Sequence, residues 1–384
     1  MNLKPLNFRN PSFVRRTIFL LLFASLLFTC EEEESVKGEF VIDVLNLESI
    51  SPENVFLNPI AVPLELTSES AIKVVTKIIA TDENYFVLDE RSYTVFIFDS
   101  TGKYVSKIVN TGDGPNSIDI IYDIRFNLFT PENEIELMSP KGKVVSYDLD
   151  SKEYKTIIGS NSDLNSIYGF INVTNDISLF YTQKGSHKLT YYSREKGEVI
   201  DGKLKNNTAK MVPLGSPCPF LAEENDPAFF LDQYTSEVYE IDGMELIKLG
   251  QYDFVGQNLS IPDLPLFVTD PSSLADYTFE NNLVYPIVSY RRTKKSVGMT
   301  VVQSGKSGKT LVFDKASGWR IVDRIDKFRF NPFISTMKDK TVGVLIDPTS
   351  LYQIFPNIDD SLIDDFDVER EMNPILITYS FLKE

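Results

Sequence analysis

The sequence predicts an all-β fold, a six-bladed β-propeller made of four-stranded antiparallel blades. A short apolar strand that ends in a turn residue recurs six times, and successive copies end 49, 45, 49, 72 and 42 residues apart. Four of these five intervals match the roughly 40–50 residues of one propeller blade. The six copies are residues 95–99, 144–148, 189–193, 238–242, 310–314 and 352–356.

A second observation is the partner strand that precedes each copy at a nearly constant distance, as 85–89 precedes 95–99. Two strands of about five residues with a short turn between them form a β-hairpin. A turn that ends at Gly102 then leads to a fourth strand at 104–109, and glycine supplies the positive φ that such a turn needs. First strands precede most of the pairs, at residues 72–79, 120–126, 168–173 and 283–290.

The third observation is the lack of a helical period, because no amphipathic helix is evident after Thr29. The run Tyr85-Phe86-Val87-Leu88 contains no polar alternation. Such a run fits a middle strand whose two faces are both covered by neighbouring blades. A β-sandwich would also contain short strands, but it would not produce this repeat.

The ring must close between its first and last blades. We expect residues 40–47 or residues 375–381 to join the last blade as its outer strand, since either would protect an exposed strand edge. The longest interval marks an insertion at 251–282, which is rich in Pro and Asp and is expected to form an irregular surface loop over one face. A second, acidic insertion is expected at 357–373.

The first 29 residues have the pattern of an export signal. The apolar stretch 18–28 is shorter than the roughly 20 residues that a spanning helix needs. The sequence Leu27-Phe28-Thr29-Cys30 resembles the lipobox of bacterial lipoproteins, in which the Cys becomes diacylated, although Phe28 and Thr29 are bulkier than the residues usual there. The alternative is an ordinary cleavable signal with an incidental Cys. The stretch is preceded by four cationic residues, Lys4, Arg9, Arg15 and Arg16.

Four consecutive glutamates, Glu31 to Glu34, follow the Cys. They resemble the acidic export tag of surface lipoproteins in one group of Gram-negative bacteria, and a solvated tether of like charges is the alternative. The chain is therefore divided into a signal peptide (1–29), an acidic lipid-anchored tether (30–38) and a propeller (39–384). We expect an outer-membrane lipoprotein that faces the cell surface rather than the periplasm.

Charge restricts the partners. Removal of the signal peptide leaves 34 basic and 55 acidic residues, a net charge of −21. Such a chain repels nucleic acid and anionic membranes, whereas cations, neutral sugars and basic peptides are compatible. Cys218 is the only other cysteine. With Cys30 acylated no internal disulfide can form, so stability must come from a buried core.

Residues 71–149 resemble the six-bladed, NHL-like propeller lipoproteins of uncharacterised function from Gram-negative bacteria. The residues that carry the resemblance are Asp82 to Asp89, the turn from Phe98 to Lys103, and Gly112-Asp113-Gly114-Pro115. The family usually continues the last motif with Gly-Glu, where this chain has Asn116-Ser117. The resemblance implies a surface or periplasmic module with a role in nutrient capture.

Two motifs are candidate ligand sites. Tyr290, Arg291 and Arg292 end a predicted innermost strand, and an arginine fork can bind a carboxylate or stack on an aromatic ring. The alternative is a solvated strand end. Gly112, Asp113 and Gly114 could present backbone N–H groups at the mouth of the central channel, or could simply form a tight crossover between blades.

Most catalytic and metal motifs are missing. His187 is the only histidine, which excludes a paired-His site, and Cys218 has no His close in sequence. The Gly-Lys pairs in 305–310 lack the upstream glycine of a phosphate-binding loop. No cofactor is expected, but a channel-bound Ca²⁺ held by oxygen ligands stays open. Four aspartates at strand ends are candidates, although turn chemistry explains them better: Asp89, Asp123, Asp232 and Asp347.

The sequence therefore favours a lipid-anchored extracytoplasmic binding module. Its partner would be a glycan, a peptide or an envelope protein, reached from a membrane anchor and with no nucleic acid involved. The alternative is a propeller enzyme, a lyase or hydrolase, that uses a divalent cation bound in the channel.

Overall fold

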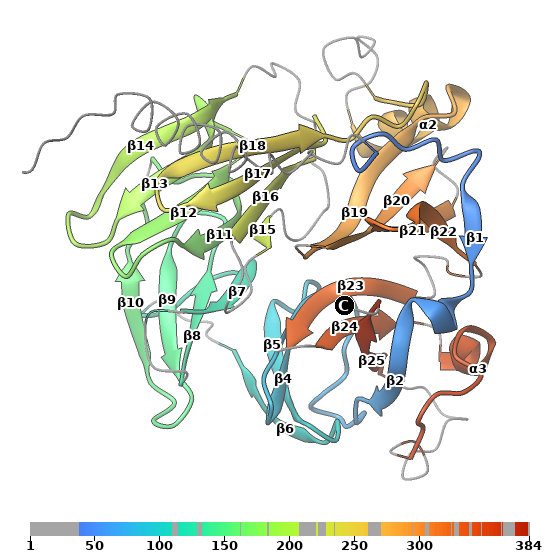
Figure 1. Cartoon of the computed structure of the whole chain (residues 1–384). Helices are drawn as coiled ribbons and strands as arrows, with labels where there is room; N and C mark the ends of the chain where they lie inside the picture. Colours follow the sequence, from blue (N-terminus) through green and yellow to red (C-terminus); the bar gives the residue numbers. More distant parts are fainter. Residues whose placement is uncertain are drawn as a thin grey trace, which may run out of the picture.

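Six separate sheets surround one axis in the computed structural model, which confirms the predicted six-bladed propeller (Figure 1). The structure describes residues 38–109, 114–127, 129, 133–161, 163–182, 184–206, 220–221, 228–233, 235–259, 270–293, 295–303, 307–323, 325, 330–337, 340–346, 348–361, 363 and 373–382. The predicted signal peptide and most of the tether lie outside these residues.

The first three blades follow the chain in order, each from its innermost to its outermost strand. Blade 1 contains β3 (Val75–Ala80), β4 (Asn84–Asp89), β5 (Thr94–Asp99) and β6 (Tyr104–Ile108). Blade 2 contains β7 (Asp123–Phe126), β8 (Glu134–Met138), β9 (Val144–Asp148) and β10 (Tyr154–Ile158). Blade 3 contains β11 (Ile167–Asn172), β12 (Ile177–Thr182), β13 (His187–Ser193) and β14 (Glu198–Lys205).

Of the last three blades, blades 5 and 6 include strands from the beginning of the chain. Blade 4 contains β15 (Phe220–Leu221), β16 (Ala228–Asp232), β17 (Glu237–Asp242) and β18 (Glu245–Gln251). Blade 5 contains β19 (Val284–Arg292), β20 (Ser296–Gln303), β21 (Ser307–Asp314) and β22 (Gly318–Val322), with β1 (Glu48–Ile50) as a fifth, parallel strand. Blade 6 contains β23 (Phe330–Met337), β24 (Lys340–Leu345), β25 (Ile375–Phe381) and β2 (Phe56–Pro63).

The ring closes through β2, which pairs antiparallel with β25 from Phe56 opposite Phe381 to Pro63 opposite Ile375. The expectation that 40–47 joins the last blade is wrong, since this segment runs beside blades 4 and 5, where Ile42 N–H donates to the Asp253 carbonyl at 2.8 Å. The segment 375–381 does join the last blade, but as its third strand. A β-branched and aromatic run fits an inner position as well as an outer one, so composition alone did not distinguish them.

The sixth predicted strand copy, 352–356, is also wrong. Residues Leu351–Ile354 form the short helix α3, preceded by the 3₁₀ turn η2 (Pro348–Ser350). Leu351 and Ile354 are buried while Tyr352 between them is 57% exposed. Buried residues three apart fit one helical turn, whereas a half-buried strand would alternate.

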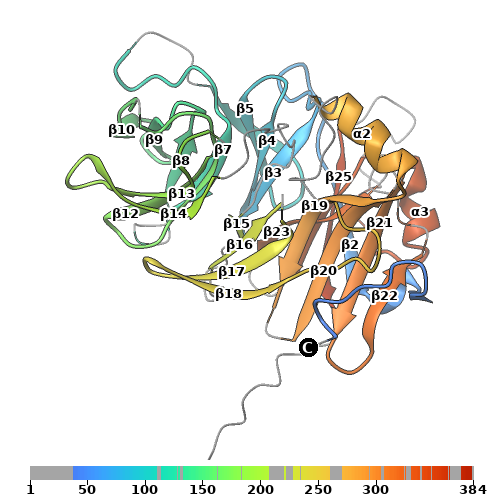
Figure 2. The same ribbon diagram turned by 90° about the horizontal axis from the view of Figure 1, so that it is seen from above.

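The insertion 251–282 is not wholly irregular, as it contains the helix α2 (Pro271–Glu280). The Asp270 side chain accepts the backbone N–H groups of Ser272 and Ser273, and Pro271 takes the first helical position. Asp before Pro was the sequence signal for this helix start. α2 lies beside blade 5 and α3 beside blade 6, on the outside of the ring (Figure 2). No helix among the described residues has the length and apolar character to cross a bilayer.

Strand direction gives the ring two distinct ends. We call the end where innermost strands such as β3 and β7 begin the entry end, and the end where they finish the exit end. The connection from β18 to β19 and that from β24 to β25 both lie at the entry end, because strands alternate in direction within a blade. Both connections therefore begin and end on the same side of the propeller.

The core is divided among the seams between neighbouring blades. Buried apolar residues fall into six clusters, and each cluster joins two adjacent blades. In the seam between blades 5 and 6, the Phe333 ring lies directly over Gly298 of β20. A Cβ atom at Gly298 would lie 2.3 Å from Phe333 Cζ, so only glycine permits this approach.

We expect Gly298→Ala to lower the free energy of unfolding by about 1–3 kcal/mol, because the added methyl group overpacks the seam. Gly159→Ala is the matched control, since a Cβ there meets nothing within 4 Å. Chemical denaturation of both variants measures the difference. Equal midpoints would contradict this account of the seam, and adding Phe333→Leu to Gly298→Ala should restore part of the loss.

Candidate functional site

A buried carboxylate links the innermost strands near the axis. Asp123 begins β7 and is fully buried. Its Oδ1 pairs with Lys77 Nζ of β3 and accepts the Ile124 N–H at 2.9 Å. Its Oδ2 accepts the Phe170 N–H of β11 at 3.2 Å. One side chain of blade 2 therefore bonds to both neighbouring blades.

Arg125 extends this network to a fourth blade. It lies two residues after Asp123 on β7, and its Nε is 4.0 Å from Asp123 Oδ2. Its Nη2 donates to the Phe220 carbonyl of β15 at 3.3 Å. Lys77, Asp123 and Arg125 thus connect the innermost strands of blades 1 to 4 and place two cations around one carboxylate.

The other aspartates considered for calcium have different roles. Asp89 organises the turn after β4: its Oδ1 accepts the Val74 N–H at 2.7 Å and its Oδ2 accepts the Ser92 hydroxyl at 2.7 Å. Asp232 pairs with Lys188 Nζ, and Asp347 lies outside the described residues. Within the described part of the chain, no three His, Cys, Asp or Glu side chains are placed to hold a metal ion.

A group of tyrosines lies at the entry end. Tyr122 immediately precedes β7, and its ring packs edge-on against Tyr168 of β11 with centroids 5.7 Å apart. Burial raises the pKa of the Tyr122 hydroxyl. The pKa is raised further by four groups near this hydroxyl: Tyr168, Glu90, Asp123 and Tyr93. Tyr93 belongs to the turn between β4 and β5 of blade 1 and is 41% exposed.

We call Tyr93, Tyr122 and Tyr168 the tyrosine arc. Its members come from three successive blades, and our sequence reasoning did not select any of them. The available signal was their position, since Tyr122 and Tyr168 each stand at the start of a predicted innermost strand. The sequence does not say how the blades are placed around the axis, so it could not show that these tyrosines come close together.

Of the predicted residues Tyr290, Arg291 and Arg292, the structure places two in one seam and the third in another. The Tyr290 hydroxyl lies 2.9 Å from the Tyr252 hydroxyl between blades 4 and 5, and Arg292 pairs in the same seam with Glu39. Burial raises the pKa of Tyr290, and the Arg292 guanidinium opposes this shift. Arg291 faces blade 6 and lies 5.8 Å from the centre of the Phe381 ring.

The described part of the predicted glycine loop, Gly114, lies just before β7 at the entry end, whereas Arg292 ends β19 at the exit end. Gly112 and Asp113 lie outside the described residues, while Gly114 is exposed. The following residues are attached to blade 2, because the Pro115 carbonyl accepts from Lys143 Nζ and from Thr156 Oγ1, each at 2.8 Å. Gly114 and Arg292 therefore lie at different ends of the ring.

The remaining sequence candidates are peripheral. His187 begins β13 and is half-buried, with its ring against Gly202 and its Nδ1 3.0 Å from Ser186 Oγ. Cys30 and Cys218 lie outside the described residues.

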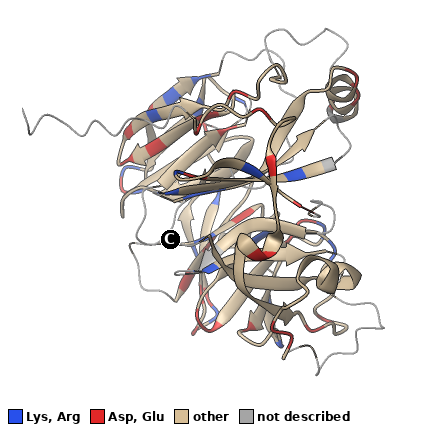
Figure 3. Ribbon diagram, turned by 45° about the vertical axis from the view of Figure 1, so that its right-hand side comes forward, with Lys and Arg blue, Asp and Glu red and all other residues tan. Residues whose placement is uncertain are grey.

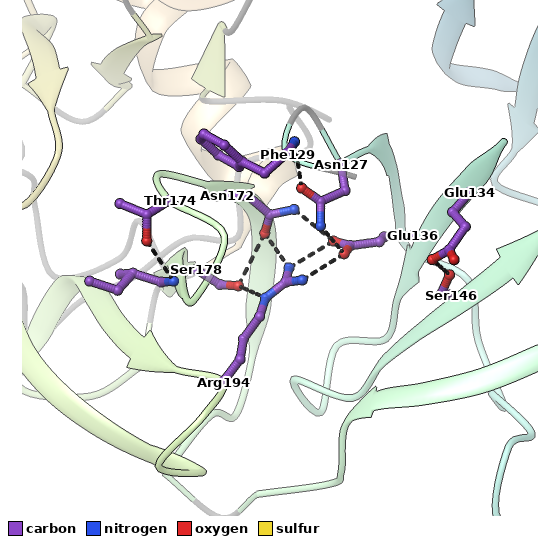
Figure 4. Close-up of polar contacts among 10 residues, drawn as sticks. Asn127, Phe129, Glu134, Glu136, Ser146, Asn172, Thr174, Ser178 and Arg194 are labelled. Carbon is purple, nitrogen blue, oxygen red and sulfur yellow. Dashed lines mark hydrogen bonds and ion pairs between the residues drawn. The ribbon is translucent and has the colours of Figure 1, made fainter. Parts of the chain in front are cut away.

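The most extensive polar network joins blades 2 and 3 (Figure 4). Arg194 donates to both Glu136 oxygens, at 2.8 and 2.9 Å, and its Nε donates to Ser178 at 2.8 Å. Asn172 and Asn127 donate to the same carboxylate at 2.9 and 3.1 Å. Because its charges are mutually satisfied and buried, this network is a structural link between blades rather than a ligand site.

A cavity of about 340 Å³ lies far from the axis, between the outer parts of blades 5 and 6. It is lined by Asn54, Leu57, Asp314, Arg320 and Leu382. Arg320 and Asp314 pair with each other and so neutralise its only charges. We favour the tyrosine arc as the candidate site because Tyr122 and Tyr168 pack together across two neighbouring blades at the entry end, with Tyr93 of a third blade near Tyr122.

Comparison with known proteins places the chain in a family. A candidate exported protein from Bacteroides fragilis NCTC 9343 has a similar crystal structure, with a TM-score of 0.67, 13% identity and coverage of 90% of this chain and 99% of that one. A member of the DUF4221 family from Bacteroides vulgatus ATCC 8482 gives a TM-score of 0.49 at 10% identity, with 85% and 97% covered. The first of these likenesses supports the fold alone.

No curated protein matches the sequence. A family profile described as a domain of unknown function, DUF4934, matches residues 40–380, which span the whole propeller. The chain belongs to the DUF4934 family.

Proposed function

We propose that this protein is an exported, lipid-anchored binding module that takes a neutral glycan at the entry end of its ring. The observation that carries the proposal is the tyrosine arc, in which three blades contribute one aromatic side chain each. Ligand sites in proteins are typically lined by aromatic side chains with a few polar groups that fix orientation. The exposed Glu90 beside Tyr122 is a polar group of this kind.

The chemistry of the arc suits a sugar. A tyrosine ring can stack on the apolar face of a pyranose, and its hydroxyl can exchange hydrogen bonds with sugar hydroxyls. Tyrosine hydroxyls are protonated donors at neutral pH, and burial raises the pKa of both Tyr122 and Tyr168 further. The net charge of −21 after signal removal disfavours a polyanionic ligand. In the view of Figure 3, acidic and basic residues are interspersed over the blades.

The export and anchoring part of the proposal is supported by the N-terminal sequence. A cationic segment, a short apolar stretch and a Cys at its end form one continuous pattern. The structurally similar Bacteroides fragilis protein is itself described as a candidate exported protein. The acidic residues 31–34 favour the cell surface as the final location.

We expect the protein to fractionate with membranes, and Cys30→Ser to move it to the soluble extracytoplasmic fraction. Cys218→Ser is the matched control and should leave the membrane fraction unchanged. Protease treatment of intact cells then tests surface exposure. A Cys30→Ser variant that stays on the membrane would rule out the lipid anchor at this residue.

We expect Tyr122→Ala and Tyr168→Ala each to weaken binding of a neutral oligosaccharide, identified on a glycan array, by about tenfold, which corresponds to roughly 1.4 kcal/mol. Tyr154→Ala is the matched control. Tyr154 is also half-buried against another tyrosine, with its ring 4.7 Å from Tyr147, but it lies on the outermost strand β10. Equal loss in all three variants would contradict the site, and binding only to basic peptides would contradict the ligand class.

The Asp123 network should be structural as well as close to the site. We expect Asp123→Asn to cost about 3–5 kcal/mol of unfolding free energy, because it leaves the buried Lys77 ammonium without its carboxylate. The control is Asp119→Asn, whose exposed pair with Lys141 at 2.7 Å should contribute less than about 1 kcal/mol. Urea denaturation distinguishes the two, and similar midpoints would show that burial adds nothing to the Asp123 pair.

A further inference from the structure

The N-terminal segment 38–47, here called the strap, fills the seam between blades 4 and 5. The Phe40 ring packs 5.2 Å from Tyr252 and sits over Gly250 of β18, where a Cβ atom would come within 2.6 Å of it. Because position 250 of blade 4 is a glycine, the blade leaves room there for an aromatic ring. Any larger residue at this position would fill that room.

Polar contacts fix the residue before Phe40. The Glu39 carboxylate pairs with the Arg292 guanidinium, which also lies 5.9 Å from the centre of the Phe40 ring. The Glu39 carbonyl accepts the indole N–H of Trp319 at 2.7 Å. Arg292, which was predicted from the sequence to bind a carboxylate, therefore binds a carboxylate of its own chain.

Backbone bonds attach the strap to the segment that follows β18. Asp253 N–H donates to the Phe40 carbonyl at 2.7 Å, and Val255 N–H donates to the Ile42 carbonyl at 3.2 Å. Burial alternates along both segments, with Ile42, Val44, Tyr252 and Phe254 turned into the core. The outward face consists of Val41, Asp43, Leu45, Asp253 and Val255.

The strap shortens the reach of the anchor. Gly38 is eight positions after Cys30, so a fully extended connection spans at most about 29 Å. Without the strap, the next residue fixed in a sheet is Glu48 of β1, and eighteen residues would span about 65 Å. A folded domain of this length has a diameter of roughly 50 Å, so only the shorter connection holds one particular rim near the membrane.

Apolar side chains are exposed on this same rim. Val41 is 50% exposed, Leu45 65% and Val255 47%, and all three lie on the outward face of the strap and its partner segment. Apolar groups at this position lower their free energy by contact with lipid. The exposed Asp43 and Asp253 beside them would be repelled by anionic lipid, so an uncharged lipid surface fits better.

We propose that the outward face of the strap rests on the lipid surface that holds Cys30, so that the rim of blades 4 and 5 faces the membrane. This inference rests on the proposed lipid anchor. The inference assigns a zwitterionic lipid bilayer as the partner of the outward face of the strap. It also gives the propeller a fixed orientation on that bilayer. The edges of blades 1 and 2 then point away from the membrane.

The test uses the full lipidated protein with Cys218→Ser, bound to phosphatidylcholine vesicles that carry an acceptor dye in the headgroup region. A donor is attached at Leu45→Cys or, as the matched control, at Lys155→Cys on β10 of the opposite rim. We expect energy transfer from position 45 to be about twofold or more higher than from position 155. The reason is that the tether holds the start of the strap within about 29 Å of Cys30. Equal transfer from the two positions overturns the inference.

A second variant tests the strap itself. Glu39→Gln with Phe40→Ala should release the strap, and the two positions should then give similar transfer. Trp319 is the only tryptophan, so a red shift of its emission reports the release independently. An undiminished difference between the positions after release would overturn the role of the strap.

Vesicle composition separates this inference from the anchor. Flotation with the vesicles tests the lipid anchor alone, and its absence would count against the proposed function rather than the orientation. Addition of phosphatidylglycerol should lower the transfer from position 45, and an increase would overturn the assignment of an uncharged lipid surface.

Discussion

The pairing of β2 with β25 is the constraint on which the rest of the structure depends. Each blade exposes two apolar faces and can bury both only if the ring is complete. The hydrogen bonds between Phe56–Pro63 and Ile375–Phe381 join residues more than 300 positions apart and complete the last blade. Once this sheet forms, the ring is closed and every blade has a neighbour on both of its faces.

The seams are not equivalent in how they are held. Four consecutive seams each carry a buried ion pair: Lys77–Asp123, Arg194–Glu136, Lys188–Asp232 and Arg292–Glu39. Every seam also contains an apolar cluster, and in the two seams that flank blade 6 the clusters include Phe56, Phe330, Val342 and Leu376. Buried pairs add little net stability, but a misplaced blade would leave their charges unpaired, so they favour the correct blade order. Apolar burial supplies the stability where the ring closes.

Sequence repetition was enough to predict the number of blades and most strands, because each middle hairpin is a local feature. It failed at the closure, where β2 and β25 come from opposite ends of the chain and no local signal connects them. It also failed at α3, where a short apolar run fits one helical turn as well as a strand.

The candidate site shows the same limit. Tyr290 and Arg292 were recognisable as unusual residues, but their partners Tyr252 and Glu39 lie far away in the sequence. The tyrosine arc depends on three blades being placed side by side around the axis. A site built from residues of several blades cannot be recognised before the arrangement of the blades is known.

The strands β1 and β2 have a consequence for folding. Both are synthesised before the blades that they complete, and their partners β22 and β25 follow much later in the chain. Until then, the edges of these two strands are open to pairing with other chains. The addition of β25 therefore ends a period in which aggregation competes with folding.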